Sequence, residues 1–488
     1  MAASTPVLLI IFIFAFLPLI LAEFARNKSL PTIEDFFLLS RRMPTYMVFF
    51  TVYATWMSAF AFLGASAYFY QMGPVYMTAI AWDIFFGLLF MIIGKRIWFY
   101  GKVNNYVTPT DFFRDIFGYK PLSIIITCVM VIFTIPYLQI QLSGGAYLIE
   151  VATSGLIPWR ISGLIFYLII IIYLWAGGLR AVALTDIFYG ACLFISMLFI
   201  GFFMVNKAGG MEYVFATITK LNVGNVTLPG PKGNEGALLW LSMFVMVPIG
   251  ALMGPQMWIR CYAVEKKTTF DIIPVFICLA AIQCIGTLLA GSTGILLVPG
   301  VSQLDKIIPV MLLKYSDEVL CTLLFCGIAS SALSTANSQI HAVAAIYTID
   351  IHKGYISRNS TEKKLVAVGK WAVLAISLIA YVLLLNNPVL IIDTGTVAMG
   401  GTAQVFVPVI GALFWSKSNG KAAAAGILSG IFVLSVLAFV TALNVTYCAA
   451  LALIFNGAIF VIGSMTFKTN LPTREKIVKY KKEYDNKI

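Results

Sequence analysis

The sequence is poor in charged residues and in histidine, and it lacks the motifs that mark common enzyme classes. Only 11% of its 488 residues are charged and only two are histidines, whereas soluble domains carry about 25% charged residues. It contains no Walker sequence, no zinc-ligand spacing and no serine-nucleophile elbow, and its eight cysteines include no Cys-x-x-Cys pair. These absences argue against an ATP-driven pump domain or a hydrolase, so we predict that the chain is not an enzyme and needs no cofactor.

What the sequence has in abundance is apolar runs near the length of about 20 residues that a membrane-spanning helix requires. The mean hydropathy is +0.93, and we predict an all-α polytopic membrane protein with about 13 transmembrane helices. The predicted spans, numbered 1 to 13, are Pro6–Leu21, Thr45–Tyr70, Pro74–Ile93, Leu122–Val151, Ile161–Trp175, Ala183–Val205, Ala237–Trp258, Ile272–Val298, Glu318–Tyr347, Leu365–Leu385, Val389–Trp415, Ala422–Val440 and Val445–Phe467. No loop is long enough for a soluble domain, so residues 1–467 form one transmembrane domain and residues 468–488 a basic tail.

Lys and Arg are distributed unevenly between alternate loops. When the loops are assigned in turn to two sides, 27 of the 33 Lys and Arg fall on the side of the C-terminal tail. This asymmetry follows the positive-inside rule, so the net charge of +12 reflects membrane topology and not nucleic-acid binding. We predict a multi-pass protein of the cell membrane with the N-terminus outside and the C-terminus cytoplasmic. The basic cluster follows span 1 and does not precede it, which favours a retained helix over a cleaved signal peptide.

Spans 2 and 7 are interrupted by polar or helix-breaking residues. Span 2 holds Ala54-Thr-Trp-Met-Ser58, and span 7 holds Val247-Pro-Ile-Gly-Ala-Leu-Met-Gly-Pro255. Such interruptions free backbone carbonyls, which are tolerated where they line a cavity or bind an ion. Interrupted helices at corresponding positions of two halves are typical of inverted-repeat secondary transporters, with repeats here at about 45–205 and 237–415. Ordinary kinked helices would give the same pattern.

A row of hydroxyl groups lies inside span 9, at membrane depth. Ser331, Ser334, Thr335 and Ser338 are three or four residues apart and therefore share one helix face. Hydroxyls in hydrocarbon need partners within the protein. Two interpretations remain open from the residues alone: close packing against another helix, or binding of a small hard cation.

Five motifs in order along nearly the whole chain resemble those of the sodium/solute symporter family. They are Glu34-Asp-Phe-Phe-Leu-Leu-Ser-Arg-Arg42, Val107-Thr-Pro-Thr-Asp-Phe-Phe-Arg114, Gly177-Gly-Leu-Arg-Ala-Val-Ala-Leu-Thr-Asp186, Pro255-Gln-Met-Trp-Ile-Arg260, and Ser334-Thr335 followed by Asp350. The resemblance implies a leucine-transporter-like inverted-repeat bundle with a sodium site between spans 2 and 9. Carried over to this chain, the sodium ligands are the carbonyls of Ala54, Met57 and Ser331 and the hydroxyls of Ser334 and Thr335.

Within this family, the sequence most resembles the pantothenate and monocarboxylate permeases. It rests on Gln141-Leu-Ser-Gly-Gly-Ala146, Arg260-Cys261 and the stretch from Ser334 to Gln339. Trp56 stands where the bacterial proline permease has an aspartate, which argues against proline as the solute. The candidate solute-binding residues are Trp56, Asp83, Tyr137, Gln141, Thr402 and Gln404; hydrogen bonding between helices is the alternative role for the polar ones.

Asp83 lies near the middle of span 3, where a charged side chain costs a few kcal/mol. A charged acid in the solute cavity would attract an amine and repel a carboxylate, while the N-terminus of a broken helix would attract a carboxylate. A carboxyl hydrogen-bonded within a helix interface is the other interpretation.

Together these observations predict a symporter that couples sodium entry to uptake of a small organic solute, such as pantothenate or a monocarboxylate. Its partners are sodium, that solute and the lipid bilayer, with no nucleic acid. A transporter-like membrane sensor and a sodium-independent uniporter or channel are the alternatives. The solute, the choice between sodium and proton, the stoichiometry and the oligomeric state are left open by the sequence.

Overall fold

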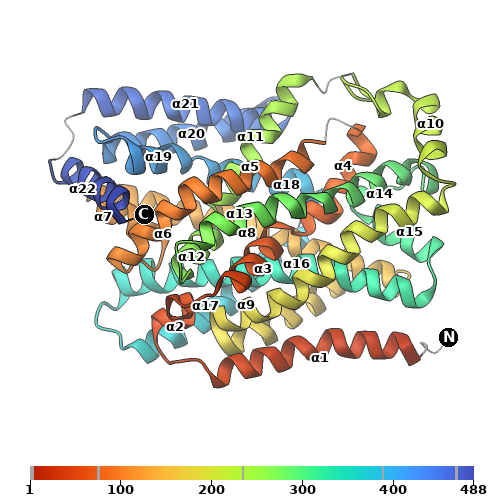
Figure 1. Cartoon of the computed structure of the whole chain (residues 1–488), viewed down its shortest axis with the longest axis horizontal. Coiled ribbons are helices and arrows are strands. Elements are labelled where there is room, and N and C mark those ends of the chain that lie inside the picture. The colour runs from red at the N-terminus through yellow and green to blue at the C-terminus, as the bar shows by residue number, and fades with distance from the viewer. Residues whose placement is uncertain (1–4, 74–76, 234–235, 387–389, 468–470, 488) are drawn as a thin grey trace.

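The computed structural model describes residues 5–73, 77–233, 236–386, 390–467 and 471–487, and within them every regular element is a helix. This confirms the all-α prediction. Figure 1 shows the helices lying side by side, with the two chain termini at opposite ends of the bundle. We call the end with the N-terminus the N-side and the end with the C-terminus the C-side.

Ten helices of the described residues are long and apolar enough to cross a membrane alone. They are Pro6–Asn27 (in α1, Thr5–Asn27), Thr78–Asn104 (α5, η4 and α6), Lys120–Ala152 (α8), Gly177–Lys207 (in α9), Thr269–Leu297 (α13, η6 and α14), Glu318–Ile356 (α16 and η8), Glu362–Asn386 (α17), Ile391–Phe414 (α18 and α19), Gly420–Val440 (α20) and Val445–Thr466 (α21). Each coincides with a span predicted from hydropathy. Two predicted first residues, Pro74 of span 3 and Val389 of span 11, lie outside the described residues.

The two interrupted spans are bent where the sequence predicted a break. In span 2, Thr45–Trp56 (α3) meets Phe60–Met72 (η2 and α4) at 53°, and in span 7, Ala237–Met253 (α11) meets Pro255–Ala263 (α12) at 58°. Each bent pair is long and apolar enough to cross a membrane when its two parts are taken together.

The predicted fifth and sixth spans belong to one long helix with an internal break. The fifth falls in the first part of α9 (Trp159–Lys207), where the apolar stretch is Trp159–Ile172. Gly178 breaks the helix with φ 57° and ψ −148°, and a Cβ there would lie 2.5 Å from the carbonyl oxygen of Phe36. Glycine therefore permits both the left-handed backbone and the close approach of the two segments.

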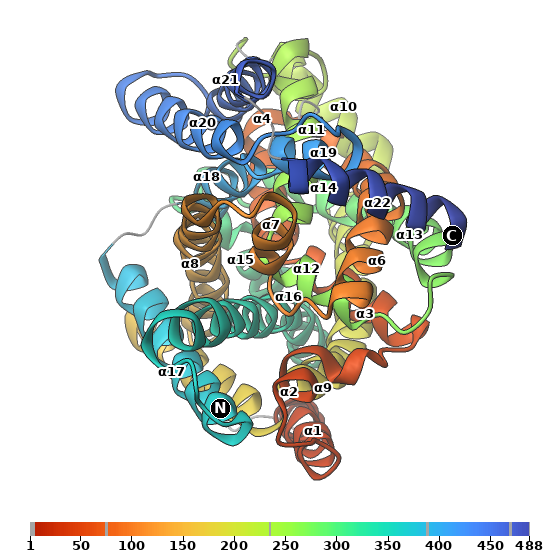
Figure 2. The same cartoon turned by 90° about the vertical axis from the view of Figure 1, so that its left-hand side faces the viewer.

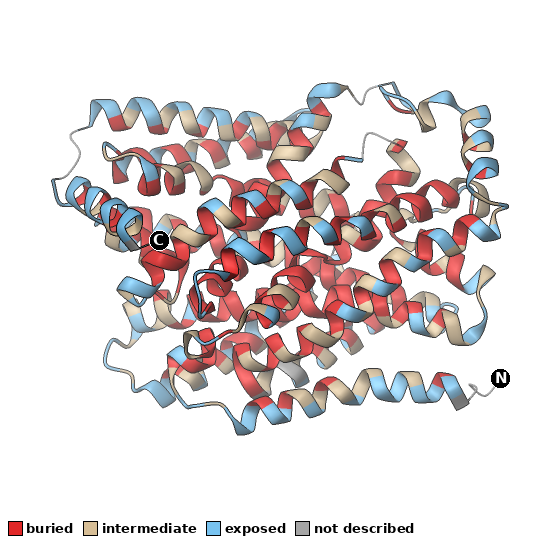
Figure 3. Cartoon of the chain, viewed as in Figure 1, coloured by how far each residue is buried: buried red, intermediate tan, exposed pale blue. Residues whose placement is uncertain are grey.

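The bundle has a buried centre and apolar, exposed outer helices. Figure 2 looks from the C-side and shows α16 inside, with α1 against α9 at one edge and the α20–α21 pair at the opposite edge. Figure 3 shows exposed residues along α1 and α21 and continuous burial in the middle. Exposed apolar side chains such as Phe432 and Ile454 on that outer pair are expected where a helix faces lipid.

Short helices close the two ends. They are Ile33–Leu38 (α2), Pro109–Phe117 (α7), Met211–Leu221 (α10), Ile307–Tyr315 (α15) and Leu471–Lys487 (α22). On the C-side, the backbone of Met43, just before α3, pairs with the end of α12: its N–H donates to Ala263 at 3.0 Å, and its carbonyl accepts from Glu265 at 3.1 Å. The C-side ends of the two bent spans are therefore joined by hydrogen bonds.

Candidate functional site

The break after α3 leaves two carbonyl groups without their helical partners. In a continuous helix, the N–H groups of Ser58 and Ala59 would bond to the carbonyls of Ala54 and Thr55. Instead, the Ser58 N–H donates to Trp56 at 3.0 Å, and the Ala59 N–H donates to the Gln141 side chain at 3.0 Å. The carbonyls of Ala54 and Thr55 are therefore free to face another group.

The group that they face is the hydroxyl row of α16. Ser334 Oγ lies 2.8 Å from the Ala54 oxygen. Thr335 Oγ1 lies 3.3 Å from the same oxygen and 3.1 Å from the Thr55 oxygen. Ser334 Oγ also lies 3.4 Å from the Ser331 carbonyl, and all of these residues are buried.

Four of the five predicted sodium ligands are thus brought together: Ala54, Ser331, Ser334 and Thr335. Met57 caps α3 with a non-helical backbone, but no contact joins its carbonyl to the hydroxyl row among the described residues. Sequence reasoning missed the Thr55 carbonyl. Two residues, Met57 and Ser58, are non-helical at the break, and a break of two residues frees two consecutive carbonyls.

A buried ion pair lies next to the hydroxyl row. The Arg260 guanidinium, on α12, lies 3.4 Å from Asp186 Oδ2 on α9 and also donates to Ser338 Oγ on α16. Its Nε donates to the Thr51 carbonyl on α3 at 3.2 Å. Both charged side chains are at most 1% exposed. One guanidinium therefore connects four helices immediately beside the candidate ion site, and this connection was not predicted.

The break in span 7 forms the wall of a cavity. Gly250 on α11 packs so closely on α18 that a Cβ would lie 2.3 Å from the Met399 carbonyl. Thr402 Oγ1, on α18, donates to the freed Gly250 carbonyl at 2.8 Å. The chain then turns at Gly254, and α12 begins with Pro255 and without a side-chain cap.

Two adjacent cavities lie between the broken spans. The first, which we call the aromatic chamber, has a free volume of about 10 Å³ and is lined by Trp56, Met57, Phe60, Ala61, Ala65, Ala79, Trp82, Asp83, Cys284, Thr287 and Met399. The second, the break chamber, has a free volume of about 20 Å³ and is lined by Phe133, Thr134, Tyr137, Gly250, Ala251, Gly254, Gln256, Ala398, Met399 and Thr402. Met399 is the residue common to both linings.

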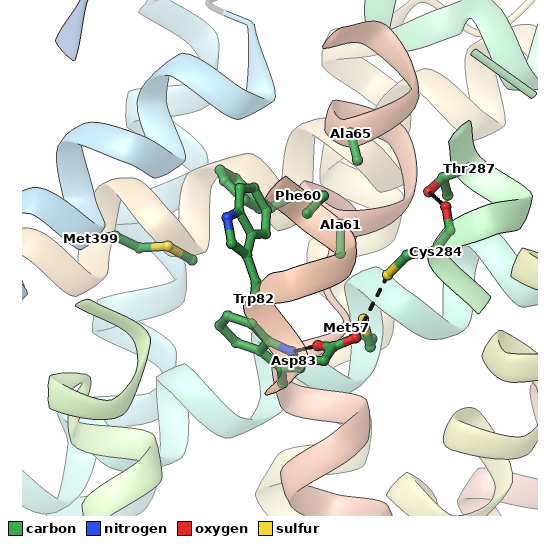
Figure 4. A pocket seen from close by; sticks show the side chains of 11 residues that line it. Met57, Phe60, Ala61, Ala65, Trp82, Asp83, Cys284, Thr287 and Met399 are labelled. Carbon is green, nitrogen blue, oxygen red and sulfur yellow. Dashed lines mark hydrogen bonds between the residues drawn. The ribbon is translucent and has the colours of Figure 1, made fainter. Parts of the chain in front are cut away.

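Asp83 is the acid of the aromatic chamber. Its carboxylate accepts a hydrogen bond from Trp56 Nε1 and lies 3.7 Å from Cys284 Sγ. Figure 4 shows Asp83 facing Cys284, with Met399 entering from the opposite side. The Trp56 ring stacks on Phe86 with centroids 4.5 Å apart, so the indole that holds the carboxylate is itself held in place.

The predicted solute-binding residues divide into three groups. Trp56 and Asp83 line the aromatic chamber, and Tyr137 and Thr402 line the break chamber. Gln141 lines neither; it supports the break in α3 through Ala59.

Gln404 also lines neither chamber. It lies at the turn between α18 (Ile391–Ala403) and α19 (Phe406–Phe414) and is engaged by Asn456 of α21, which donates to its backbone and side-chain oxygens at 2.7 and 3.1 Å. Gln256 and Trp82 line the chambers but were not predicted. For Gln256, the signal in the sequence was its position two residues after Gly254 at the break.

On the N-side, four residues that we call the outer latch connect α4, η7 and α18: Tyr68, Asp305, Ile391 and Asp393. Tyr68 on α4 donates to Asp393 on α18. Asp305, in the short helix η7 (Leu304–Lys306), accepts from the Ile391 N–H at 3.1 Å. Burial raises the pKa of Asp305 to about 7. The hydrogen bond from Ile391 lowers this pKa in part, and the nearby Asp393 carboxylate raises it.

Comparison with known proteins adds three findings. The model of the sodium:solute symporter family matches residues 36–430. A sodium/pantothenate symporter from Escherichia coli is 27% identical over 461 residues, covering 92% of this chain and 93% of that protein. A sodium/pantothenate symporter from Haemophilus influenzae is 26% identical over 431 residues, covering 87% of this chain and 88% of that protein.

The fold also has a solved counterpart. The structure of a sodium-coupled sialic acid symporter, bound to substrate in an outward-open state, superposes with a TM-score of 0.81. The two chains share 16% identity, and the superposition covers 95% of this chain and 98% of the other. The bundle is therefore of the leucine-transporter type, as the resemblance to the symporter family implied.

Proposed function

Because the chain belongs to the sodium:solute symporter family, it couples import of a small organic solute to sodium, and we propose where the ion binds and what the solute is. The family confirms the resemblance inferred from the five motifs. It also confirms that the chain is a multi-pass membrane transporter and not an enzyme, and that sodium is its coupling ion.

Sodium binds where the hydroxyl row of α16 meets the break in α3. The observation that carries this proposal is the convergence of Ser334 and Thr335 on the freed carbonyls of Ala54 and Thr55, with oxygen–oxygen distances of 2.8 to 3.3 Å. Ser331 and Met57 supply further carbonyls at the edge of the site. Hydroxyl and carbonyl oxygens suit a small hard cation, and because all are neutral, the ion can also be released.

The solute is a small carboxylate, with pantothenate as the first candidate. Two relatives that match more than four fifths of the chain are named for pantothenate, and the Gln141–Ala146 stretch resembles the same group of permeases. The solute occupies the aromatic chamber and the adjoining break chamber. The aromatic chamber lies beside the proposed sodium site, because Trp56 and Met57, which line it, directly follow Ala54 and Thr55 in the chain.

The protein works in the cell membrane with its N-side outside, as the Lys and Arg asymmetry predicts. A membrane potential then adds about 2.3 kcal/mol per charge per 100 mV to sodium entry. Sodium bound between α3 and α16 favours the conformation that accepts solute, and by linkage the solute raises the affinity for sodium equally.

Uptake by proteoliposomes tests the function. Purified protein is reconstituted with an inward sodium gradient, an inward proton gradient or neither, and labelled pantothenate, lactate, proline, glucose and choline are offered in turn. We expect uptake of a carboxylate only with sodium. Equal uptake with and without the sodium gradient would favour the uniporter alternative, and sodium binding without uptake of any solute would favour the sensor.

A further inference from the structure

We propose that the tail helix α22 (Leu471–Lys487) is a strap that holds the C-side of the bundle closed and must detach before a solute can leave on that side. Such a strap acts on the transport cycle as a whole. The inference therefore goes beyond the proposed sodium site and solute and does not depend on either.

The walls of the two chambers have to move apart before a solute can pass. The chambers have free volumes of about 10 and 20 Å³, which is about the room that a single water molecule needs. Their linings come from several spans and include Asp83 on α5, Tyr137 on α8 and Met399 on α18. Release of a solute on the C-side therefore requires the C-side ends of these spans to separate.

The tail helix contacts the C-side ends of the same spans. α6 continues the span of α5, α19 continues that of α18, and α7 leads into α8. α22 packs against α6, α7 and α19, and Figure 2 shows it lying across the C-side of the bundle. Its first residue, Leu471, follows the end of α21 at Thr466 after a short connection. The chain itself therefore holds one end of the strap.

One face of α22 is buried against the bundle. Thr473, Ile477 and Tyr480 are buried, and their spacing of four and three residues places them on the same side of the helix. Arg474 and Lys481 are exposed. α22 is therefore an amphipathic helix seated on the other helices, with these basic residues on its outer face.

The anchor of the strap on α7 is Asp115. Lys476 Nζ lies 2.6 Å from Asp115 Oδ1, and the Tyr480 hydroxyl lies 2.9 Å from Oδ2. The side chains of Lys476 and Asp115 are 40% and 27% exposed. Since water reaches this ion pair, its strength is modest, and the anchor can open and close again.

The anchor on α6 and α19 is formed by a hydroxyl and a cation. The Tyr480 hydroxyl also lies 2.8 Å from Asn104 Oδ1 on α6. The Arg96 guanidinium, on α6, lies 4.0 Å from the ring centroid of Tyr484 on α22 and 4.6 Å from that of Phe414 on α19. Such cation–aromatic contacts are attractive. Separation of α6 from α19 would break this arrangement, so docked α22 opposes that separation.

The test measures access to the aromatic chamber from the C-side. Cys284, which lines this chamber, is kept as the only cysteine, and an impermeant thiol reagent is added to membrane vesicles. The C-side is defined as the side from which Lys482→Cys reacts in a separate variant. The rate at which the peptide that carries Cys284 is labelled, measured by mass spectrometry, reports C-side opening without the need for a transported solute.

Two lysine variants compare a docking residue with a matched control. Lys476→Met should speed the labelling of Cys284 by about five-fold, because the loss of one contact of ordinary strength shifts an equilibrium by about that factor. Lys479→Met should change the rate by less than about two-fold, since Lys479 is 68% exposed and its ion pair is with Glu483 on α22 itself. Equal rates in the two variants would overturn the proposal.

A reversible crosslink tests the strap in the opposite direction. In the full chain, Asn104→Cys and Tyr480→Cys are joined by a short bis-methanethiosulfonate reagent, which fixes α22 to α6. We expect Cys284 to be labelled at least about five-fold more slowly in the crosslinked protein than after reduction of the crosslink. The two single variants, treated with the same reagent, are the controls and should show no such difference.

Recovery of slow labelling by the crosslink shows that the double variant is folded. Fast labelling of Cys284 from the C-side while α22 is crosslinked to α6 would show that the chamber opens without release of the helix, and the proposal would be wrong. Both outcomes are independent of which solute is carried and of which oxygens bind sodium.

Discussion

Ser334 on α16 donates a hydrogen bond of 2.8 Å to the carbonyl of Ala54, an oxygen that the break in α3 has released from its helix. The two residues are 280 positions apart in the chain, so the contact joins the first broken span to the ninth span. An ion held by these oxygens would stabilise the arrangement in which α3 and α16 are together. Ion binding and the position of α3 are therefore linked.

The first prediction concerns these hydroxyls. Ser334→Ala and Thr335→Ala should each raise the sodium concentration for half-maximal uptake about ten- to a hundred-fold, because a lost charge-assisted contact costs about 1.5–3 kcal/mol. Sodium titration of solute uptake measures the change. Ser330→Ala is the matched control, since its hydroxyl bonds within α16 to the Cys326 carbonyl at 2.8 Å. Normal sodium dependence in both test variants would refute the site.

The second prediction concerns orientation. In a cysteine-free background, a cysteine at exposed Lys220 on the N-side should react with an impermeant thiol reagent in intact cells, because the Lys and Arg bias places that loop outside. A cysteine at exposed Lys482 on α22 should react only after the membrane is opened. The reverse labelling pattern would invert the proposed topology.

The third prediction concerns the buried pair of Asp186 and Arg260, whose charged atoms lie 3.4 Å apart. Arg260→Met should destabilise the protein by about 3–5 kcal/mol, because it leaves a buried carboxylate without its partner. The double variant Asp186→Leu/Arg260→Met should recover much of this loss. Thermal unfolding in detergent measures both, and a double variant no more stable than the single one would show that the pair matters through its other hydrogen bonds.

The fourth prediction concerns the outer latch and pH. Asp305 has a pKa of about 7 in the closed structure, above its ordinary value of 3.8, because burial disfavours the charge. Between about pH 4 and about pH 7, Asp305 therefore keeps its proton while the latch is closed and would release it if exposed. The stability of the closed latch falls as pH rises through this window. Asp393, Tyr68 and Tyr147 are the other titratable groups near it.

Reactivity of a cysteine in the aromatic chamber measures latch opening. Using Cys284 as the only cysteine, labelling from the N-side should increase from pH 5.5 to pH 8, after correction for the intrinsic pH dependence of the thiol. Asp305→Asn keeps an acceptor for the Ile391 N–H but cannot ionise, so it should remove the increase. An unchanged pH profile in this variant would exclude Asp305 as the titrating group.

The fifth prediction concerns the tail helix α22, which docks on the C-side. Lys476 Nζ contacts Asp115 Oδ1 at 2.6 Å, and Tyr480 donates to Asp115 Oδ2 at 2.9 Å. Burial raises the pKa of Asp115, but the hydrogen bonds from Lys476, Tyr106 and Tyr480 outweigh it and hold the pKa below the ordinary 3.8. The contribution of Asp115 to docking is therefore fully present above about pH 4. This contribution is lost as the pH falls through the lowered pKa of Asp115.

A nitroxide label at Lys482→Cys reports this docking by its mobility. Lys476→Met should mobilise the label at pH 7, whereas Lys479→Met should not. Lys479 is 68% exposed, and its ion pair among the described residues is with Glu483 on its own helix. In the unmodified tail, mobility should stay low from pH 8 to pH 5. Equal mobility in the two lysine variants would mean that the Asp115 contacts do not hold α22.

Much of this protein was determined by local sequence. Apolar runs near the thickness of a bilayer specified the spanning helices, because each backbone polar group in lipid must bond within its own segment. Proline, glycine and polar residues inside spans 2 and 7 specified where those helices break. The spacing of Ser331, Ser334 and Thr335 placed three polar groups on one face, since helix geometry alone decides which side chains share a face.

Only the tertiary structure decided which of these groups meet. The sequence showed that Gln141 and Gln404 were polar and buried in spans, but not that Gln141 supports the break at Ala59 or that Gln404 binds Asn456 on α21. It showed an uncommon acid at Asp83 and a helix break at Gly254, but not that Met399 lies between them. Contacts between helices far apart in the chain depend on how all the helices pack together, and no local pattern encodes that arrangement.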